Sequence, residues 1–443
     1  MNLVVLALAQ FLLALDYSIV YVALPGIADD LGLDLGTAQW VVSAYAVPFA
    51  GFLLVGGRLA DRVGASRLFV AATALFGVAS VAGGLAGDGA VLLAARGAQG
   101  VAAALLQPAI LGLIGMSFAP GPARTRALSV WGAVGASGLA AGVVLGGLLT
   151  RASWRWTFLV NVPVTVFCAV GGLLWLAAQG ATRRRVPLRA SLLGTGAALA
   201  VVLALTFAGS LVAWTLAAVL AAAFLANERY SPAPLVDRSL RRIRSLRLGA
   251  AATALYMASV GSEFYVVTLL LQRLRGYEPL LAGIAFLPLA AMVTLGSSAT
   301  AATIRRLGTA RTLSAAFGLA AAGLAALAAG GGGSYVTGLL PGLLVSGFAH
   351  GMIYTSMFIL GARDVPPEQQ SSAAALLTTS QYLSGAVTVA TLTLVLAGNH
   401  FGAAFWITAG CAALGAALSL RRPRPPLAGP ARPTEDHASP TPA

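Results

Sequence analysis

The sequence is poor in charge and contains no lysine. Only 9% of its 443 residues are charged, whereas a soluble globular domain carries about 25%. Hydrophobic residues make up 58% of the chain, and the mean hydropathy is +0.86. Because so few charges cannot cover a water-soluble surface, lipid is expected to face much of this protein.

Cysteine and histidine are also scarce, with two and three residues. Cys168 and Cys411 lie inside apolar runs without a partner at metal-ligand spacing, so neither a disulfide nor a metal site is expected. The missing lysine excludes a phosphate-binding loop of the Gly-x4-Gly-Lys type, so ATP is not expected to supply energy. The sequence has no paired His cluster and no Ser/His/Asp arrangement. An enzyme and a bound cofactor are therefore not expected.

What the sequence does have is a series of long apolar runs. A helix needs about 20 apolar residues to cross the hydrocarbon core of a membrane, and fourteen such candidates follow one another along the chain. Their predicted limits are 3–24, 38–57, 68–87, 90–118, 127–149, 157–178, 190–207, 210–226, 248–271, 281–303, 312–329, 335–361, 372–397 and 402–420. The stretch that holds the seventh and eighth candidates is too long for one crossing and is divided at Gly209-Ser210 into a tight helical hairpin.

The arginines indicate the orientation. Of the 28 Arg residues, 23 lie in loops on one side or in the tail, four lie in the opposite loops, and Arg96 lies within a span. Because cytoplasmic loops carry the excess of Arg, both termini are expected in the cytoplasm and the chain in the cell membrane. The same bias accounts for the net charge of +14, so a nucleic-acid partner is not expected.

A short repeat divides the chain. Residues 61–67 (DRVGASR) and 305–311 (RRLGTAR) share the pattern of Arg, an apolar residue, Gly, two small residues and Arg. The pattern predicts two six-helix halves, 1–179 and 248–420, related by an axis along the membrane normal. Residues 180–247 between them are expected to form an inserted two-helix hairpin and a basic cytoplasmic connector.

Two polar segments complete the predicted organisation. Residues 227–247 are basic and are expected to form the amphipathic cytoplasmic connector near lipid headgroups. Residues 421–443 are rich in proline and are expected to be a disordered cytoplasmic tail. The expected fold class is therefore an all-α integral membrane protein with fourteen transmembrane helices.

Three charged residues lie inside predicted spans: Asp16, Arg96 and Glu263. Charge within a membrane is costly and marks functional sites. At about 1.5 Å of rise per residue the three lie at comparable depth, so they can share one polar cavity. Asp16 and Glu263 are predicted to bind protons and a cationic substrate in turn, with Arg96, which does not deprotonate, tuning them. The alternatives are that the acids only bond a neighbouring helix and that the arginine extends to the outer surface.

Small and aromatic residues complete the candidate site. Gly138, Gly142 and Gly146 recur at every fourth residue of the fifth span, which predicts close helix packing and a surface that slides during transport. His350 can titrate, although a single His among apolar residues is more often a packing residue. Polarity or aromaticity marks eight candidates for a substrate pocket: Tyr17, Tyr21, Gln99, Trp131, Tyr256, Phe264, Tyr354 and Gln381.

Five motifs, in order along the chain, resemble those of one family. They are residues 15–25 (LDYSIVYVALP), 57–64 (GRLADRVG), 96–100 (RGAQG), 138–147 (GLAAGVVLGG) and 154–163 (WRWTFLVNVP). They are similar to motifs of the fourteen-span drug:proton antiporters of the major facilitator superfamily, and the resemblance covers nearly the whole chain.

This resemblance implies a role for each motif. It implies proton coupling or cation recognition for Asp16 and proton transfer for Arg96. In the second motif an Asp and an Arg would pair across the cytoplasmic ends of helices and latch the outward-facing state. The gating residues that it implies are Gly57, Asp61, Arg62 and Gly64. The sequence departs from the family pattern at Ala65-Ser66, which replace a basic pair, at Val143, which replaces Pro, and at Tyr21, which replaces Asn.

The expected function is secondary export of an amphipathic, often cationic small molecule in exchange for protons. A monomer in the lipid bilayer is expected to carry it out. Two alternatives remain open: a dedicated exporter of one natural product that gives self-resistance, and a membrane scaffold or sensor without transport.

Overall fold

The structure, a computed structural model, describes residues 1–33, 35–176, 188–206, 209–232, 234, 236–330, 332–396 and 398–420. Within these residues the chain is helical and has no strand. The predicted tail, 421–443, and the start of the predicted insert, 180–187, lie outside the described residues, as does the side chain of Tyr21.

Long helices dominate the described residues because lipid offers no hydrogen bonds to the backbone, so a crossing segment must pair its own N–H and C=O groups. In the first part of the chain the helices are α1 (Asn2–Leu31), α2 (Leu35–Val63), α3 (Ala65–Gly84), α4 (Gly89–Ser117), α5 (Pro122–Thr150), α6 (Trp156–Leu159) and α7 (Asn161–Trp175). The middle part has α8 (Leu188–Thr206), α9 (Leu211–Tyr230) and α10 (Arg238–Arg242). The last part has α11 (Arg244–Tyr256), η1 (Met257–Gly261), α12 (Ser262–Leu269), η2 (Leu270–Leu274), α13 (Pro279–Ile284), α14 (Leu287–Leu307), α15 (Thr309–Gly330), η3 (Tyr335–Leu339), α16 (Leu340–Ala362), η4 (Pro367–Gln369), α17 (Gln370–Leu396) and α18 (Phe401–Ser419).

Both segments of the loop repeat form a glycine turn. Gly64 (φ 97°) joins α2 to α3, and Gly308 (φ 79°) joins α14 to α15. Glycine adopts positive φ without the steric penalty of a Cβ atom. The chain therefore reverses direction in the same way at two places 244 residues apart.

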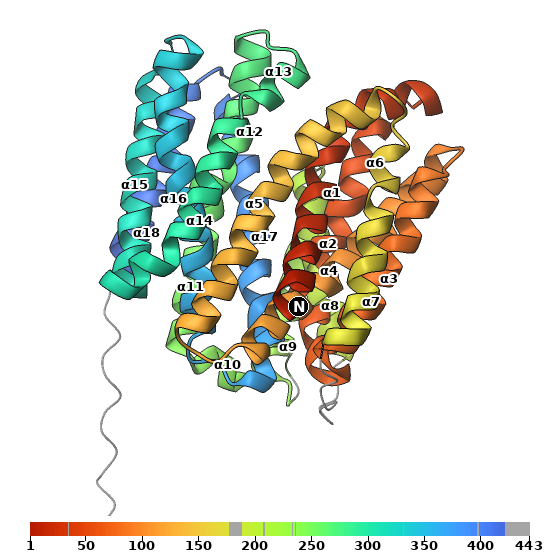
Figure 1. Cartoon of the computed structure of the whole chain (residues 1–443), viewed down its shortest axis with the longest axis vertical. Helices are drawn as coiled ribbons and strands as arrows, with labels where there is room; N and C mark the ends of the chain where they lie inside the picture. The colour runs from red at the N-terminus through yellow and green to blue at the C-terminus, as the bar shows by residue number, and fades with distance from the viewer. Residues whose placement is uncertain are drawn as a thin grey trace, which may run out of the picture.

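The helices form two bundles that stand side by side (Figure 1). In one bundle α1 packs on α5 and α2 packs on α4, and in the other α14 and α15 pack on α16. The bundles meet where α5 contacts α14 and where α2 contacts α17. We call the end that holds the N-terminus and α10 the basal end, and the end that holds α6 and α13 the apical end (Figure 1).

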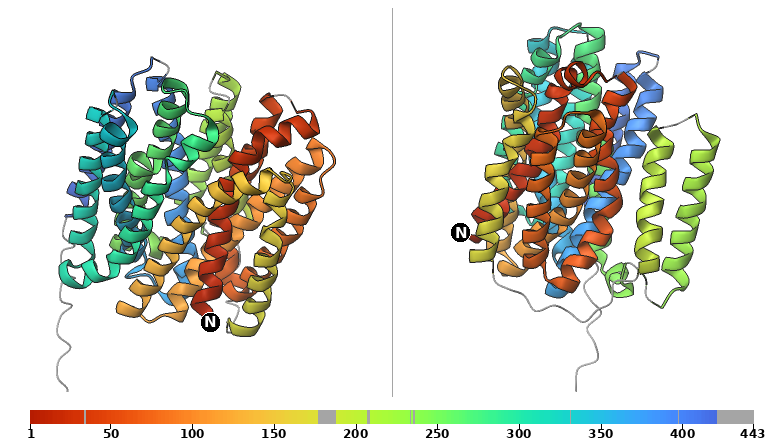
Figure 2. Two further views of the ribbon diagram at one scale, coloured as in Figure 1. Left: turned by 45° about the horizontal axis from the view of Figure 1, so that its top comes forward. Right: turned by 90° about the vertical axis from the view of Figure 1, so that its right-hand side faces the viewer.

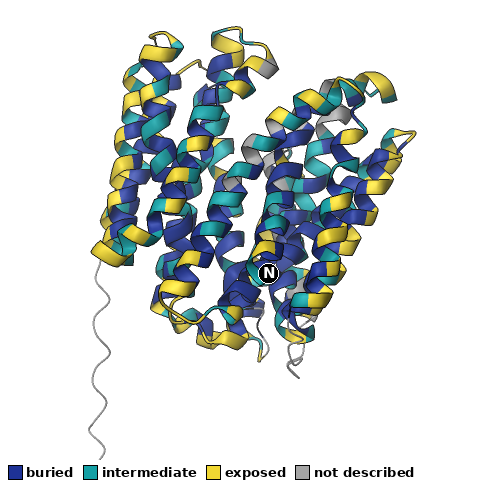
Figure 3. Ribbon diagram, viewed as in Figure 1, coloured by how far each residue is buried: buried dark blue, intermediate teal, exposed yellow. Residues whose placement is uncertain are grey.

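The hairpin of α8 and α9 lies against one side of the bundles (Figure 2). Helix α8 packs on α2 and on α17, and α9 packs on α8. Large apolar side chains of α9, among them Leu211, Val212 and Leu225, are exposed. Exposed residues also follow the outer faces of the bundles, for example on α3 and α15 (Figure 3). Apolar side chains on these faces suit contact with lipid rather than water.

Eleven helical stretches of the described residues are long and apolar enough to cross a membrane. The predicted count of fourteen is therefore not confirmed. The three other predicted spans coincide with α5, α8 and α17, which are not among the eleven.

The polar segment predicted at 227–247 is shorter in the structure. Helix α9 extends to Tyr230 and α11 begins at Arg244, so the helices take in both ends of the segment. Glu228 accepts hydrogen bonds from the Val236 backbone N–H and from the Arg241 guanidinium. These bonds join the two ends of the connector.

The predicted span 248–271 is not a regular helix. Its α-helical turns are interrupted by the π-helical segment η1 and followed by a second one, η2. Inside η1, Ser259 has the non-helical dihedrals φ −116° and ψ −106°. The helix is therefore kinked here, and Glu263 lies in the first turn of the α12 helix that follows.

Candidate functional site

Asp16 lies in the middle of α1, with no exposed surface. Its Oδ2 accepts a hydrogen bond from Arg96 Nη1 at 2.8 Å, and its Oδ1 accepts one from Asn161 Nδ2 at 2.8 Å. Gln99 Nε2 also donates to Oδ1, at 3.2 Å. Three donors from α4 and α7 therefore converge on one carboxylate, and one of them carries a positive charge.

Arg96 is held from several sides. Its Nε donates to the Val41 carbonyl oxygen at 2.9 Å, and its Nη1 donates also to Gln99 Oε1 at 3.0 Å. The guanidinium lies 4.4 Å from the ring centroid of Tyr45, a cation–π distance. The side chain is 2% exposed, so the prediction that Arg96 contacts an acidic neighbour fits the geometry, and extension to the outer surface does not.

This ion pair balances its own charge inside the bundle. A buried ion pair persists where hydrogen bonds satisfy the remaining donors and acceptors. The network reaches α3 as well through Gln99 Nε2, which also donates to Ser80 Oγ at 2.9 Å. Asp16 and Arg96 therefore join α1, α2, α3, α4 and α7 at one point.

Glu263 is as buried as Asp16 but has different partners. Its Oε1 accepts a hydrogen bond from Ser346 Oγ of α16 at 2.6 Å. Its Oε2 has no hydrogen-bond partner among the described residues. No ion pair to Glu263 is found in the described part of the chain. The structure thus separates the three predicted charges into an Asp16–Arg96 pair and a single Glu263.

A second polar contact lies one helical turn along α16 from Ser346. The Nε2 atom of His350 and the hydroxyl oxygen of Tyr256 are 2.6 Å apart, and the two rings meet edge to face. Phe264, the neighbour of Glu263, stacks on Phe286 with centroids 4.7 Å apart. Aromatic rings and one imidazole therefore lie on the helices around the acid.

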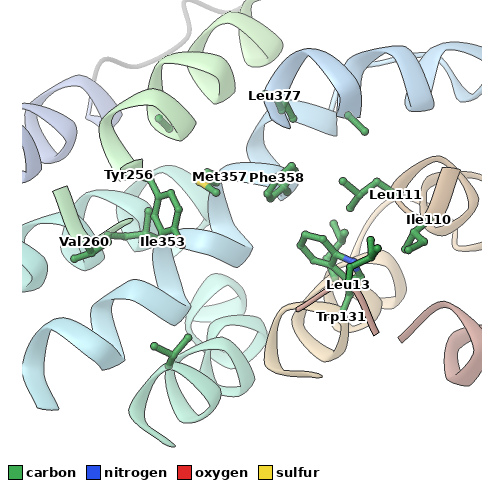
Figure 4. Close-up of a cluster of buried hydrophobic side chains, with 14 of the residues drawn as sticks. Leu13, Ile110, Leu111, Trp131, Tyr256, Val260, Ile353, Met357, Phe358 and Leu377 are labelled. Atoms are coloured by element: carbon green, nitrogen blue, oxygen red, sulfur yellow. The ribbon is translucent and has the colours of Figure 1, made fainter. Parts of the chain in front are cut away.

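Aromatic rings also join the two bundles. Trp131 of α5 stacks on Tyr354 of α16 with centroids 5.1 Å apart and meets Phe358 edge to face at 5.3 Å. Figure 4 shows the buried side chains around this contact, with Trp131 and Phe358 labelled. Near the other side of the interface, Phe49 of α2 meets Tyr382 of α17 edge to face at 4.8 Å. Movement of the bundles must separate these rings.

The eight predicted pocket residues have different positions. Gln99 belongs to the Asp16 network, and Trp131 and Tyr354 close the interface between bundles. Tyr256 is bonded to His350, whereas Tyr17 is 42% exposed at the middle of α1. Phe264 packs on Phe286, Gln381 is buried on α17, and the side chain of Tyr21 is not described. Four of the seven described side chains are therefore buried, Phe264 and Tyr354 are partly buried, and Tyr17 is exposed.

The predicted gate lies at the basal end of the interface. Asp61 accepts hydrogen bonds from the Ser372 backbone N–H at 3.1 Å and from Ser372 Oγ, at the start of α17. A Cβ atom added at Gly57 would lie 2.5 Å from Ala375 Cβ and 2.8 Å from the Ser371 carbonyl oxygen. The lack of a side chain at Gly57 thus allows α2 and α17 to touch, and Asp61 fastens the contact.

The ion pair of this region comes from Arg58. Its Nη1 lies 3.3 Å from Asp237 Oδ2, and its Nη2 donates to the Pro234 carbonyl oxygen at 2.9 Å. Gln369 Nε2 donates to the same Asp237 oxygen at 3.5 Å. Arg62, the residue that the sequence predicted, is exposed at the end of α2. The connector between α9 and α11 is therefore attached to the gate through Arg58.

The predicted glycine stripe lies on the contact between α1 and α5. A Cβ atom added at Gly138 would lie 2.7 Å from the Phe11 carbonyl oxygen, and one added at Gly142 would lie 2.7 Å from the Leu15 carbonyl oxygen. Gly146 is also buried. The two backbones approach as closely as the stripe predicted.

Several residues of the site were not predicted. Asn161 stands in a motif that resembles the family, and a lone amide among apolar residues could have marked it as a buried donor. Ser346 and Asp237 have no such signal, because serine is common in these helices and Asp237 lies in a polar connector. Among the described residues no group of three or more His, Cys, Asp or Glu side chains could hold a metal ion.

Comparisons with known proteins agree with this fold. Residues 6–389 match the Major Facilitator Superfamily. The chain is 37% identical over 418 residues to the puromycin resistance protein pur8 of Streptomyces alboniger, which covers 90% of this chain and 82% of that protein. It is 34% identical over 477 residues to the cephamycin export protein CmcT of Amycolatopsis lactamdurans, which covers 99% and 95%.

A third relative and two solved structures extend the likeness. The tetracenomycin C resistance and export protein of Streptomyces glaucescens is 32% identical over 412 residues, covering 90% of this chain and 76% of that protein. The crystal structure of the human organic anion transporter MFSD10 matches with a TM-score of 0.71 at 18% identity, over 94% of this chain and 98% of that one. The proton:xylose symporter XylE matches with a TM-score of 0.68 at 14% identity, over 94% of each chain. With its fold, its sequence match and its relatives in accord, the chain is an all-helical, membrane-embedded transporter that belongs to the Major Facilitator Superfamily.

Proposed function

We propose that this chain exports small molecules, often amphipathic cations, in exchange for protons. The observation that carries export is the similarity, over 90% or more of the chain, to proteins named for antibiotic resistance or export. The proton is suggested by the buried acids Asp16 and Glu263. A carboxyl group inside a low-dielectric bundle is suited to bind a proton or a cation.

The proposed topology has fourteen crossings with both termini in the cytoplasm of the cell membrane. The basal end would then face the cytoplasm. The halves 1–179 and 248–420 would move against each other, with the insert 180–247 at their side. This arrangement is supported by the equivalent glycine turns at Gly64 and Gly308.

Alternating access follows from the contacts between the halves. In the proposed cycle the basal contacts of Gly57 and Asp61 with α17 hold the cytoplasmic side closed. Opening that side requires Trp131 to leave Tyr354 and the gate to separate. The site that binds the proton would be exposed to one side at a time.

Transport is tested with purified protein in proteoliposomes. We expect an imposed pH gradient to drive uptake of ethidium, a cationic dye, and to leave empty liposomes unchanged. The variant Asp61→Ala is expected to slow this flux because it loses the gate contact with Ser372. Absence of gradient-dependent flux for ethidium and for puromycin alike would favour a scaffold or sensor and overturn the proposal.

A dedicated exporter of one natural product is the second candidate. It is favoured by relatives that are each named for a single compound: puromycin, cephamycin and tetracenomycin C. Expression in an efflux-deficient bacterium separates the candidates. Reduced susceptibility to many unrelated cations indicates broad export, and reduced susceptibility to one compound class indicates a dedicated exporter.

A further inference from the structure

The two buried acids lie within one helical turn of corresponding positions in the two bundles. The repeat relates positions 244 residues apart, so Val260 corresponds to Asp16 and Glu263 lies one turn further along. In the first bundle the partner of the acid comes from α4, and in the second it comes from α16. Leu340 of α16 corresponds to Arg96. The second bundle therefore has a buried acid, as the first bundle has, but no cation at the position that corresponds to Arg96.

The two acids therefore differ in how their negative charge is neutralised. Asp16 can remain ionised, because a guanidinium and two amides bind it. An ionised carboxylate without a cation is strongly disfavoured in a buried site. Glu263 has one serine hydroxyl and an unpartnered Oε2. In this conformation the charge of an ionised Glu263 must be neutralised by a proton or a cation that comes from outside the site.

No described neighbour supplies that charge. The titratable groups on the elements packed around Glu263 are Tyr256 and Tyr354, the imidazole of His350, Tyr382 of α17, Cys411 of α18, and Arg273 of η2. Arg273 is exposed toward the apical end. The His350 imidazole contacts the hydroxyl of Tyr256 and makes no ion pair in the described structure.

We propose that Glu263 is the exchangeable site of the transporter and that Asp16 with Arg96 is a fixed structural pair. This inference rests on the proposed function and deepens it. Glu263 carries a proton on Oε2 in the state described here, with Oε1 as the carbonyl oxygen that Ser346 holds. A monovalent organic cation that reaches the site takes the place of the proton, which leaves to water, so one proton is released for each cation bound.

The irregular helix that carries Glu263 can pass the effect of this exchange to other parts of the protein. Glu263 follows the π segment η1, whose Ser259 departs from helical dihedrals. The helix is kinked at this residue, four residues before Glu263. A change of occupant at Glu263 can therefore be passed to α12 and to the interface between the bundles. Ser346 acts as a positioning residue, since it orients the carboxyl group through Oε1.

The proposal is tested by infrared spectroscopy of the purified protein at neutral pH. The C=O stretch of a protonated carboxyl group differs from that of a carboxylate and reports the proton directly. We expect one such band in the unmodified protein, its loss in Glu263→Gln, and its retention in Asp16→Asn. Glu278→Gln, which changes an exposed acid of the apical loop, is the matched control and is expected to keep the band.

Ser346→Ala separates positioning from mere packing. It is expected to keep the band but to shift its frequency, because the carbonyl oxygen loses its hydrogen bond. Absence of the band from the unmodified protein, its persistence in Glu263→Gln, or its loss in Asp16→Asn overturns the proposal. Circular dichroism of each variant verifies that the helices are retained.

A second measurement counts protons with tetraphenylphosphonium, a monovalent organic cation, in weakly buffered detergent solution. One proton released per cation bound is expected for the unmodified protein and for Glu278→Gln, and none for Glu263→Gln. Equal release from all three overturns the assignment to Glu263. Neither measurement requires transport, so a missing flux in proteoliposomes with the band present would reject the proposed function and leave only the proton on Glu263 established.

Discussion

In the first bundle, the acid on the first helix lies against a guanidinium, and in the second it lies against a serine hydroxyl. Both acids are fully buried, so solvent does not explain the difference. Asp16 accepts three hydrogen bonds from charged or amide donors, whereas Glu263 accepts one. The two bundles thus hold their buried acids with different partners. In the proposal, the Asp16–Arg96 pair is a fixed part of the first bundle, and Glu263 of the second bundle binds the proton or the cation.

The largest expected loss of stability comes from breaking the Asp16–Arg96 ion pair. Arg96→Leu leaves the Asp16 carboxylate buried without a cation, and loss of one partner of a buried ion pair costs about 3–5 kcal/mol. Ser346→Ala removes one hydrogen bond from a site without an ion pair and is expected to cost about 1 kcal/mol. Denaturant unfolding in detergent measures both free energies.

A double variant controls this comparison. The double variant with Asp16→Asn and Arg96→Gln removes both charges. Its loss of unfolding free energy is expected to be smaller than the sum of the losses of the two single variants, because the two side chains interact. Equal losses for Arg96→Leu and Ser346→Ala would mean that the two bundles hold their acids in equivalent ways after all.

The helices and the first acid site were largely predictable. Long apolar runs give helices wherever backbone groups must pair within a segment, and Asp16 and Arg96 stand out because charge in a span is rare. The count of crossings and the irregular turn at Ser259 were not predictable. A π segment depends on how the helix packs against its neighbours, and no residue type marks it.

The separation of Glu263 from the other two charges was also outside the reach of the sequence. Depth along a helix follows from residue spacing, and it predicted a shared cavity. Which bundle face a side chain reaches depends on helix rotation and on packing partners. Ser346 decides the local chemistry of Glu263, yet a serine among many in apolar helices carries no signal of its own.

The second prediction compares helix contacts in the two bundles. Gly142 on α5 touches the α1 backbone, and an added Cβ would lie 2.7 Å from the Leu15 carbonyl oxygen. At Gly385 on α17 the nearest atom is the terminal methyl of Met257, 2.8 Å away. Gly142→Ala is expected to destabilise by about 1–3 kcal/mol, because the backbone cannot move aside without strain.

The matched variant is Gly385→Ala. A methionine side chain is flexible and can give way, and alanine is favoured over glycine within a helix by about 1 kcal/mol. This variant is therefore expected to unfold at the same denaturant concentration as the unmodified protein or at a higher one. If both variants lose the same stability, the contrast between a backbone contact and a side-chain contact is wrong.

The third prediction concerns the basal gate, which belongs to both bundles. Asp61→Ala removes the acceptor of two hydrogen bonds from Ser372, and hydrogen bonds to a charged group are worth about 1.5–3 kcal/mol each. Asp237→Asn weakens a partly exposed contact with Arg58 and is expected to matter less. Both variants are expected to increase the fraction of molecules whose basal side is open.

Cysteine labelling measures this shift. With Cys168 and Cys411 replaced, a cysteine introduced at Ala375, which faces Gly57, is labelled by a hydrophilic maleimide only when the gate opens. We expect faster labelling in Asp61→Ala than in Asp237→Asn, and slowest labelling without either change. The reverse order would assign the latch to the connector rather than to the contact of α2 with α17.

The smallest expected effect comes from an exposed version of the Asp–Arg chemistry that is buried at Asp16. Near the apical end, Asp30 Oδ2 accepts hydrogen bonds from Trp154 Nε1 at 2.9 Å and from Arg155 Nη1 at 2.6 Å. The bond from the Trp154 indole, followed by that from the guanidinium, lowers the pKa of Asp30 below its ordinary value of 3.8. Because the folded-state pKa is the lower one, this contact stabilises the fold above the ordinary pKa. Its contribution is lost as the pH falls through the folded-state value.

Asp30→Asn is therefore expected to lower the unfolding midpoint slightly at neutral pH and to match the unmodified protein in acid. The effect is small because the Asp30 side chain is 47% exposed, so water screens the pair. Unfolding in detergent at neutral pH and at about pH 3 measures the difference. A loss at neutral pH as large as that of Arg96→Leu would show that burial is not what separates the two pairs, and the fixed role of Asp16 would then need another explanation.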